Sequence, residues 1–289
     1  MLARLIATAQ RHAARPHLCV PRLSIRSSDA PGVPVPILFQ PVFYMLLQGG
    51  KRMTMAGKSS DWTPGTCAVA SVGLPFITQT IEATPERPYL GIEIRLDAGI
   101  VAGLLLDMPD QQHEESEGGG GAMTTAQASA SVLEPFKRLV GLLDAPEDVA
   151  VLAPNFEREL YYRLLQGPMG GTLRQIGRTN TRFAQIRAAA TWICQHADAP
   201  LSVPHLAASV GMSVTSFHRH FKIATGQSPL AYQHHLRLIE ARRRLASGSV
   251  TVTETAFASG YASAAQFSRE YKRLFGIAPF RDLGLLRQA

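Results

Sequence analysis

The spacing of hydrophobic positions changes along the chain. Over residues 1–14, Leu2, Leu5, Ile6 and Ala9 recur on one face, and this period predicts an amphipathic helix. Between 31 and 108 the pattern becomes short runs rich in β-branched and aromatic residues, broken by glycine and proline. We therefore expect an antiparallel barrel or sandwich of five or more strands over about 31–108.

The pattern then returns to helix through a segment of low complexity. Residues 113–131 contain four consecutive glycines and many small polar residues, so we expect a flexible loop there. Apolar residues recur at helical spacing over 132–144 and 155–166. These two helices are either a core packed on the strands or the face of a dimer. The sequence GPMGG at 167–171 is typical of a break between two halves.

The last third of the chain holds one supersecondary unit twice. Residues 203–229 align with 252–279 when one residue is inserted after the central glycine, and the match pairs Phe217 with Phe267. Each copy reads as a helix that ends at glycine, a serine cap, and a second helix that ends at another glycine before proline. This order is typical of a helix-turn-helix, and a long basic helix over about 229–246 joins the two copies.

The second helix of each copy is predicted to enter the major groove of DNA. Its outward side chains are Thr215, His218, Arg219 and Lys222 in the first copy, and Ala265, Gln266, Arg269, Lys272 and Arg273 in the second. Arginine can donate two hydrogen bonds to guanine, glutamine can pair with adenine, and alanine can contact only a thymine methyl group. The alternative is a solvated helix face, but two copies at a fixed spacing favour DNA.

Charge is distributed unevenly between the two halves. The chain has 289 residues, which suggests two domains. From Thr172 onward there are 15 Lys and Arg against 5 Asp and Glu, whereas the preceding part has 14 against 17. The net charges are therefore +10 and −3, consistent with +7 for the whole chain. The basic C-terminal third is where a nucleic-acid surface is expected.

The second copy resembles the signature of the AraC/XylS family of transcription regulators. The residues that carry the resemblance are Ala256, Gly260, Tyr261, Ser263, Phe267, Arg269, Tyr271, Lys272, Phe275, Gly276 and Pro279. Gln266 and Ala278 depart from the usual pattern, which bears on base preference. The resemblance implies that each chain reads two successive major-groove segments of a promoter or operator, contacts RNA polymerase, and leans towards activation.

The N-terminal half resembles the sensor domain of one subgroup of that family. The motifs that carry this resemblance are Gln48–Lys51, Pro64-Gly65, Leu74-Pro75, Glu82–Glu86, Pro88–Leu90, Leu152–Pro154, Glu157–Glu159, Tyr162–Leu165 and Gly167-Pro168. It implies a cupin-like barrel that binds a small-molecule effector, followed by helices that form a homodimer. Candidate residues for lining the effector site are Met45, Trp62, Phe76 and Tyr89, although all four also suit a plain core.

The expected fold is α+β and multidomain. Residues 1–171 form the sensor and dimerisation domain, with the barrel at about 31–108, the loop at 113–131 and helices at 132–166. Residues 179–289 form an all-α DNA-binding domain with two helix-turn-helix motifs. The start of the chain, rich in arginine and alanine, also fits a transit peptide, but the amphipathic helix explains it better. We expect a cytoplasmic, nucleoid-associated protein without a membrane segment.

The residue inventory argues against an enzyme. The strand region has no histidine between His17 and His113, so a histidine-rich cupin metal site is excluded. The three cysteines are scattered, and they cannot build the four-cysteine zinc site of a related alkyl-transfer module. We expect no catalytic residues, metal or cofactor. Two alternatives stay open: a non-specific architectural DNA-binding protein with a vestigial barrel, and a cupin-type enzyme fused to a DNA-binding domain.

Overall fold

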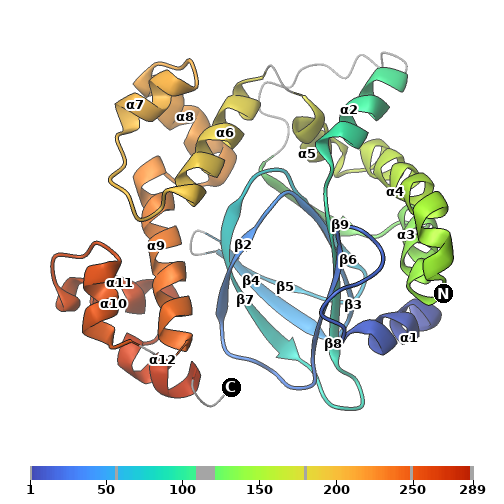
Figure 1. The fold of residues 1–289 in the computed structure, drawn as a ribbon, viewed down its shortest axis with the longest axis horizontal. Coiled ribbons are helices and arrows are strands. Elements are labelled where there is room, and N and C mark those ends of the chain that lie inside the picture. The colour runs from blue at the N-terminus through green and yellow to red at the C-terminus, as the bar shows by residue number, and fades with distance from the viewer. Residues whose placement is uncertain (1, 56–57, 109–120, 179–180, 248–249, 287–289) are drawn as a thin grey trace.

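A β-rich N-terminal half and an all-helical C-terminal half lie side by side (Figure 1). The structure is a computed structural model that describes residues 2–55, 58–108, 121–178, 181–247 and 250–286. Its strands are β1 (Leu23–Ser28), β2 (Val35–Phe39), β3 (Val42–Gln48), β4 (Gly50–Met55), β5 (Lys58–Trp62), β6 (Thr66–Ala70), β7 (Leu74–Glu82), β8 (Tyr89–Arg95) and β9 (Met123–Gln127).

The strands form two antiparallel sheets that face each other. One has the order β1-β8-β3-β6-β9 and the other β2-β7-β4-β5. Aromatic rings pack between their inner faces: the ring centroid of Tyr44 on β3 lies 5.6 Å from that of Trp62 on β5 and 6.2 Å from that of Phe39 on β2. The sheets are not closed into a single barrel, so the predicted cupin-like barrel is corrected to two facing sheets. Instead of a further strand, the C-terminal half covers the β2 edge of the four-stranded sheet.

The strands and helices also differ from the prediction near the ends of the strand region, residues 31–108. Strand β1 precedes residue 31, and helix α2 (Ala98–Asp107) lies inside the range predicted as strand. The side chain of Asp97 caps α2 by accepting hydrogen bonds from the backbone N–H groups of Gly99 and Ile100. Within the predicted loop 113–131, residues 123–127 form β9, because their backbone pairs with β6. Residues 113–120 lie outside the described residues.

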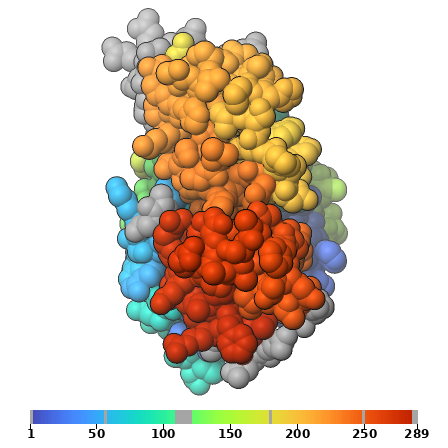
Figure 2. All heavy atoms as spheres, turned by 90° about the vertical axis from the view of Figure 1, so that its left-hand side faces the viewer, coloured from blue at the N-terminus to red at the C-terminus, as the bar shows by residue number. Residues whose placement is uncertain are grey.

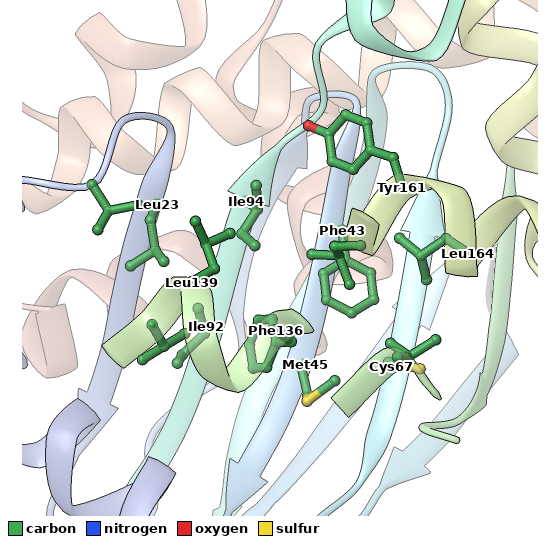
Figure 3. Packing of buried hydrophobic residues seen from close by; sticks show 14 of the residues in the cluster. Leu23, Phe43, Met45, Cys67, Ile92, Ile94, Phe136, Leu139, Tyr161 and Leu164 are labelled. Carbon is green, nitrogen blue, oxygen red and sulfur yellow. The ribbon is translucent and has the colours of Figure 1, made fainter. Parts of the chain in front are cut away.

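Helices cover the outer face of the five-stranded sheet. They are α1 (Leu2–His12), α3 (Ala130–Gly141), the short 3-10 turns η1 (Leu142–Asp144) and η2 (Pro146–Asp148), α4 (Val149–Gln166) and α5 (Gly170–Gly177). Phe43 on β3 packs edge-on against Phe136 of α3, with ring centroids 5.6 Å apart (Figure 3). Leu139, Tyr161 and Leu164 are buried in the same cluster. The apolar stripes of α3 and α4 therefore belong mainly to the core, which favours the first of the two predicted interpretations.

The C-terminal half contains the two predicted helix-turn-helix units. Helix α6 (Arg182–Gln195) precedes α7 (Val203–Ser209) and α8 (Val214–Thr225), and α9 (Pro229–Ala246) leads to α10 (Val252–Ala258), α11 (Ala264–Phe275) and α12 (Pro279–Leu286). The segment 167–171, predicted as the break between the halves, forms the turn into α5, and Met169 is buried there. Thr179, the predicted start of the second domain, lies outside the described residues.

The two halves share a continuous buried surface. Inner-face residues of both sheets and residues of α6–α9 belong to one hydrophobic cluster. The hydroxyl of Tyr232 on α9 donates a 2.6 Å hydrogen bond to the carbonyl of Gly73, just before β7. The guanidinium of Arg242, also on α9, donates to the carbonyl of Pro34, just before β2. Helix α9 is thus fixed to the edge of the four-stranded sheet.

Candidate functional site

The second helices of the two units, α8 and α11, are built by the same local interactions. The side chain of Ser213 accepts a 3.4 Å hydrogen bond from the N–H of Ser216, and Ser263 accepts one of 3.2 Å from Gln266. Both helices end at a glycine with φ near +75°, a conformation that other residues rarely adopt. The inner faces are aromatic pairs with 5.4 Å between ring centroids, Phe217 with Phe221 and Phe267 with Tyr271.

The predicted DNA-contacting residues lie on the outer faces of these two helices. Thr215, Arg219, Lys222, Ala265, Arg269, Lys272 and Arg273 are exposed, and His218 and Gln266 are half-buried. Among the residues that the structure describes, the arginines and lysines of this set form no ion pair. Figure 2 shows the two units one above the other on the same side of the molecule. Their cations are therefore available to phosphates and base edges.

The basic residues of α9 have different roles, because most of them are bound within the protein. Arg242 pairs with Asp282, and Arg243 and Arg244 both pair with Glu240. Arg237 donates to backbone carbonyls just after α6, including a 2.6 Å bond to that of Ala197. Arg237 and Arg242 thus connect α9 to neighbouring segments, whereas the arginines and lysines predicted to contact DNA on α8 and α11 form no ion pair among the described residues.

Gln266 has a neighbour that the sequence did not predict. Its side-chain amide donates a 3.3 Å hydrogen bond to Glu270, one turn further along α11. Glu270 also accepts a 3.2 Å bond from the hydroxyl of Tyr261 and pairs with His234 of α9. Gln266 is therefore oriented by a carboxylate, which leaves its amide oxygen free to accept a hydrogen bond from an adenine amino group.

The four candidate effector residues do not lie together: three are between the two sheets, and one is on the outer face of the five-stranded sheet. Trp62, Phe76 and Tyr89 are buried between the two sheets. Met45 is buried on the outer face, where it packs near Phe136 (Figure 3). Neighbouring positions on β3 alternate between the faces, so Met45 cannot share a space with Tyr44 or Tyr89. Tyr89 lines a cleft among the described residues, whereas Met45, Trp62 and Phe76 are not part of its lining.

This cavity is a cleft of about 660 Å³ between the edges of the two sheets. Strands β1 and β8 form one wall, and β2, β4 and β7 form the other. It contains Lys51, whose burial lowers its pKa from 10.5 to about 8. Burial also raises the pKa of Tyr89 to about 12. Lys51 was missed as a candidate, although its alternation with exposed Arg52 and buried Met53 places it in the inward phase of β4.

This architecture defines a class: a DNA-binding protein with two helix-turn-helix units attached to a sheet-rich half that contains a cleft. Two comparisons identify the family. Residues 19–172, more than half of the chain, match the AraC-type transcriptional regulator N-terminus, and residues 206–281 match a helix-turn-helix domain. The chain belongs to the AraC-type transcriptional regulators, which are not enzymes.

Among curated proteins, the chain is similar to the HTH-type transcriptional activator RhaS of Salmonella typhimurium and of Salmonella agona. Each is 29% identical over 163 residues, which is 56% of this chain and 58% of the relative. The match thus spans little more than half the length of these relatives.

Among solved structures, the fold is similar to that of ToxT from Vibrio cholerae. The unsaturated fatty acid-bound wild-type protein gives a TM-score of 0.56 at 9% identity, over 92% of this chain and 96% of ToxT. An apo variant of ToxT gives 0.56 at 11% identity, over 92% and 98%. At these identities the similarity concerns the fold alone.

No helix among the described residues has the length and apolar content needed to cross a bilayer. No group of three or more His, Cys, Asp or Glu side chains in that part of the chain is arranged to hold a metal ion.

Proposed function

We propose that this protein is a sequence-specific transcription factor that activates its promoters in response to a small molecule bound by its N-terminal half. The observation that carries the proposal is the pair of matched helices, α8 and α11, whose exposed arginines and lysines are free of ion pairs within the described structure. The name of the RhaS relatives supports activation. The fatty acid bound to ToxT supports a role of the sheet-rich half in binding an effector.

The proposed division of labour follows the two halves. Residues 1–171 sense the effector, and residues 179–289 bind DNA. We also propose that the protein works in the cytoplasm, contacts RNA polymerase at its promoters and forms a homodimer. Because the apolar stripes of α3 and α4 are largely buried, dimerisation would use their outer faces, where Val151 and Tyr162 of α4 are exposed.

Removing either recognition arginine should relax sequence preference. We expect Arg219→Ala and Arg269→Ala each to weaken binding to the specific operator by about 1–3 kcal/mol, because each can donate two hydrogen bonds to one guanine. Preference should relax at one base pair in each variant. The measurement is a binding titration against the operator, found by genome-wide mapping of bound sites, and against single-base variants of it.

Arg243→Ala is the matched control, since Arg243 is an exposed arginine of the same half that pairs with Glu240. It should leave the base preference unchanged. If both recognition variants keep the wild-type preference, the assignment of α8 and α11 is wrong. Footprinting separates the remaining alternative, because discrete protection indicates a regulator and uniform coating indicates an architectural protein.

A further inference from the structure

Lys51 is a buried lysine that lines the cleft. Strand β4 turns it inward beside Met53, while the neighbouring Arg52 points outward and pairs with Asp61 at 2.6 Å. Lys51 retains only 6% of its possible exposure. A lysine in this position is unusual, because burial of an ammonium group is unfavourable unless a partner compensates for the lost water.

The described residues supply no such partner. No hydrogen bond or ion pair to the Lys51 ammonium forms among them. Its Nζ lies over three aromatic rings, at 4.6 Å from the centroid of Tyr44, 5.7 Å from Tyr89 and 5.8 Å from Phe39. Ring faces attract a cation, but they do not satisfy the three N–H donors of an ammonium group as oxygen acceptors do.

The described carboxylates around the cleft do not form an ion pair with Lys51. The one carboxylate that lines it, Glu93, lies 3.4 Å from Arg26 of β1 and accepts a 3.3 Å hydrogen bond from Ser24. Arg22 at the rim pairs with Glu157 at 2.5 Å and with Asp97 at 3.4 Å. Each of these carboxylates therefore has an arginine partner, whereas Lys51 receives only the longer-range Coulombic attraction of Glu93, which does not offset its burial.

A second polar group in the cleft, the hydroxyl of Tyr89, can also donate a hydrogen bond to a ligand. The hydroxyls of Tyr44 and Tyr89 are 2.7 Å apart and buried, so one donates to the other. When Tyr44 donates, the proton of Tyr89 is free, and Tyr89 lines the cleft. An ammonium and one hydroxyl donor match the two oxygens of a carboxylate better than the larger charge of a phosphate dianion. The adjoining wall from β2 is apolar, with Ile37, Leu38 and Phe39.

We propose that the cleft binds a small monocarboxylate with an apolar body, which pairs with Lys51 and accepts a hydrogen bond from Tyr89. This inference rests on the proposed function, since it names the chemical class of the effector. The apolar body lies against β2, where Ile37 and Phe39 line the cleft.

The test uses the full-length protein and calorimetric titration with hexanoate, decanoate and 4-phenylbutyrate, each beside its neutral primary amide. At least one carboxylate should bind with one-to-one stoichiometry and roughly 10- to 100-fold more tightly than its amide, because the amide lacks the charge. Lys51→Met should weaken carboxylate binding by a similar factor and bring it close to that of the amide. Lys58→Met makes the same chemical change at an exposed position of β5 and should bind like the wild type.

Three results would overturn the proposal: no carboxylate binds the wild type, amides bind as well as carboxylates, or Lys51→Met retains the preference for the carboxylate. Circular dichroism of the same samples verifies that Lys51→Met is folded, and Tyr89→Phe provides a second variant that should weaken binding without removing the charge. Operator binding is measured in parallel. If the wild type binds its operator specifically but binds no carboxylate, only this inference is refuted. If the wild type binds DNA without sequence specificity, the proposed function is refuted.

Discussion

Replacing Asp282 by asparagine should lower the free energy of unfolding by about 3–5 kcal/mol, because it leaves a buried guanidinium without its counter-charge. Asp282 on α12 and Arg242 on α9 are almost fully buried, at 1% and 3% side-chain exposure, and two hydrogen bonds of 2.6 and 2.9 Å join them. Asp282 also accepts a 2.6 Å bond from the hydroxyl of Tyr271 on α11. The carboxylate thus connects three helices of the second unit.

Urea denaturation followed by circular dichroism measures this effect. Glu240→Gln is the matched control, because it also removes a carboxylate that pairs with arginines of α9, but one whose side chain is 39% exposed. Exposed ion pairs contribute little, so the control should change stability far less. Equal effects of the two substitutions would contradict the assigned role of the buried pair. We further expect the Asp282 variant to lose binding to the operator segment read by α11.

Replacing Lys51 by methionine should have the opposite sign and stabilise the ligand-free protein by about 2 kcal/mol at pH 7. A pKa lowered from 10.5 to about 8 makes protonation in the folded state less favourable by about 3 kcal/mol. Methionine removes this penalty and fills a similar volume, although it also forfeits the attraction of the three rings for the cation, about 0.5–2 kcal/mol.

The same substitution predicts a pH dependence. Below pH 8 the folded protein carries the buried charge and the full penalty. Between about 8 and 10.5 the unfolded state binds more protons than the folded state at this residue, so wild-type stability should rise with pH relative to the variant. Unfolding titrations of both proteins at a series of pH values measure the difference. If the difference in unfolding free energy between the two proteins stays constant from pH 7 to beyond 10.5, the titration of Lys51 does not contribute to stability.

The sequence predicted the helical half well because its signals are local. Serine caps, glycine ends and aromatic pairs at i,i+4 are each read within one helix, and α8 and α11 form as these signals indicate. Exposure of Arg219 and Arg269 followed from the same period. The role of α9 was not predictable in this way, because the partners of Arg242 and Arg237 come from other segments of the chain.

The sheets show the reverse case. Short runs of β-branched and aromatic residues indicated strands over about 31–108, but they could not determine how the strands pair or whether the sheets close, since pairing joins segments such as β1 and β8 that are distant in sequence. The face of the sheet on which Met45 lies could not be predicted either, because it depends on which helices and strands cover each face. Lys51 carried a readable signal in its inward phase, but only the facing sheet shows that it has no counter-charge.

Strand β2 is shared between the cleft and the helix that separates the two DNA-binding units. Ile37 and Phe39 line the cleft, and the carbonyl of Pro34 just before the strand receives Arg242 from α9. A displacement of this strand would therefore alter how both units are presented to the helical repeat of the operator. Such linkage is reciprocal: if a ligand in the cleft strengthens operator binding, the operator strengthens ligand binding by the same factor. Molecules already on a promoter would then fill their clefts at lower ligand concentrations than free molecules in the same cell.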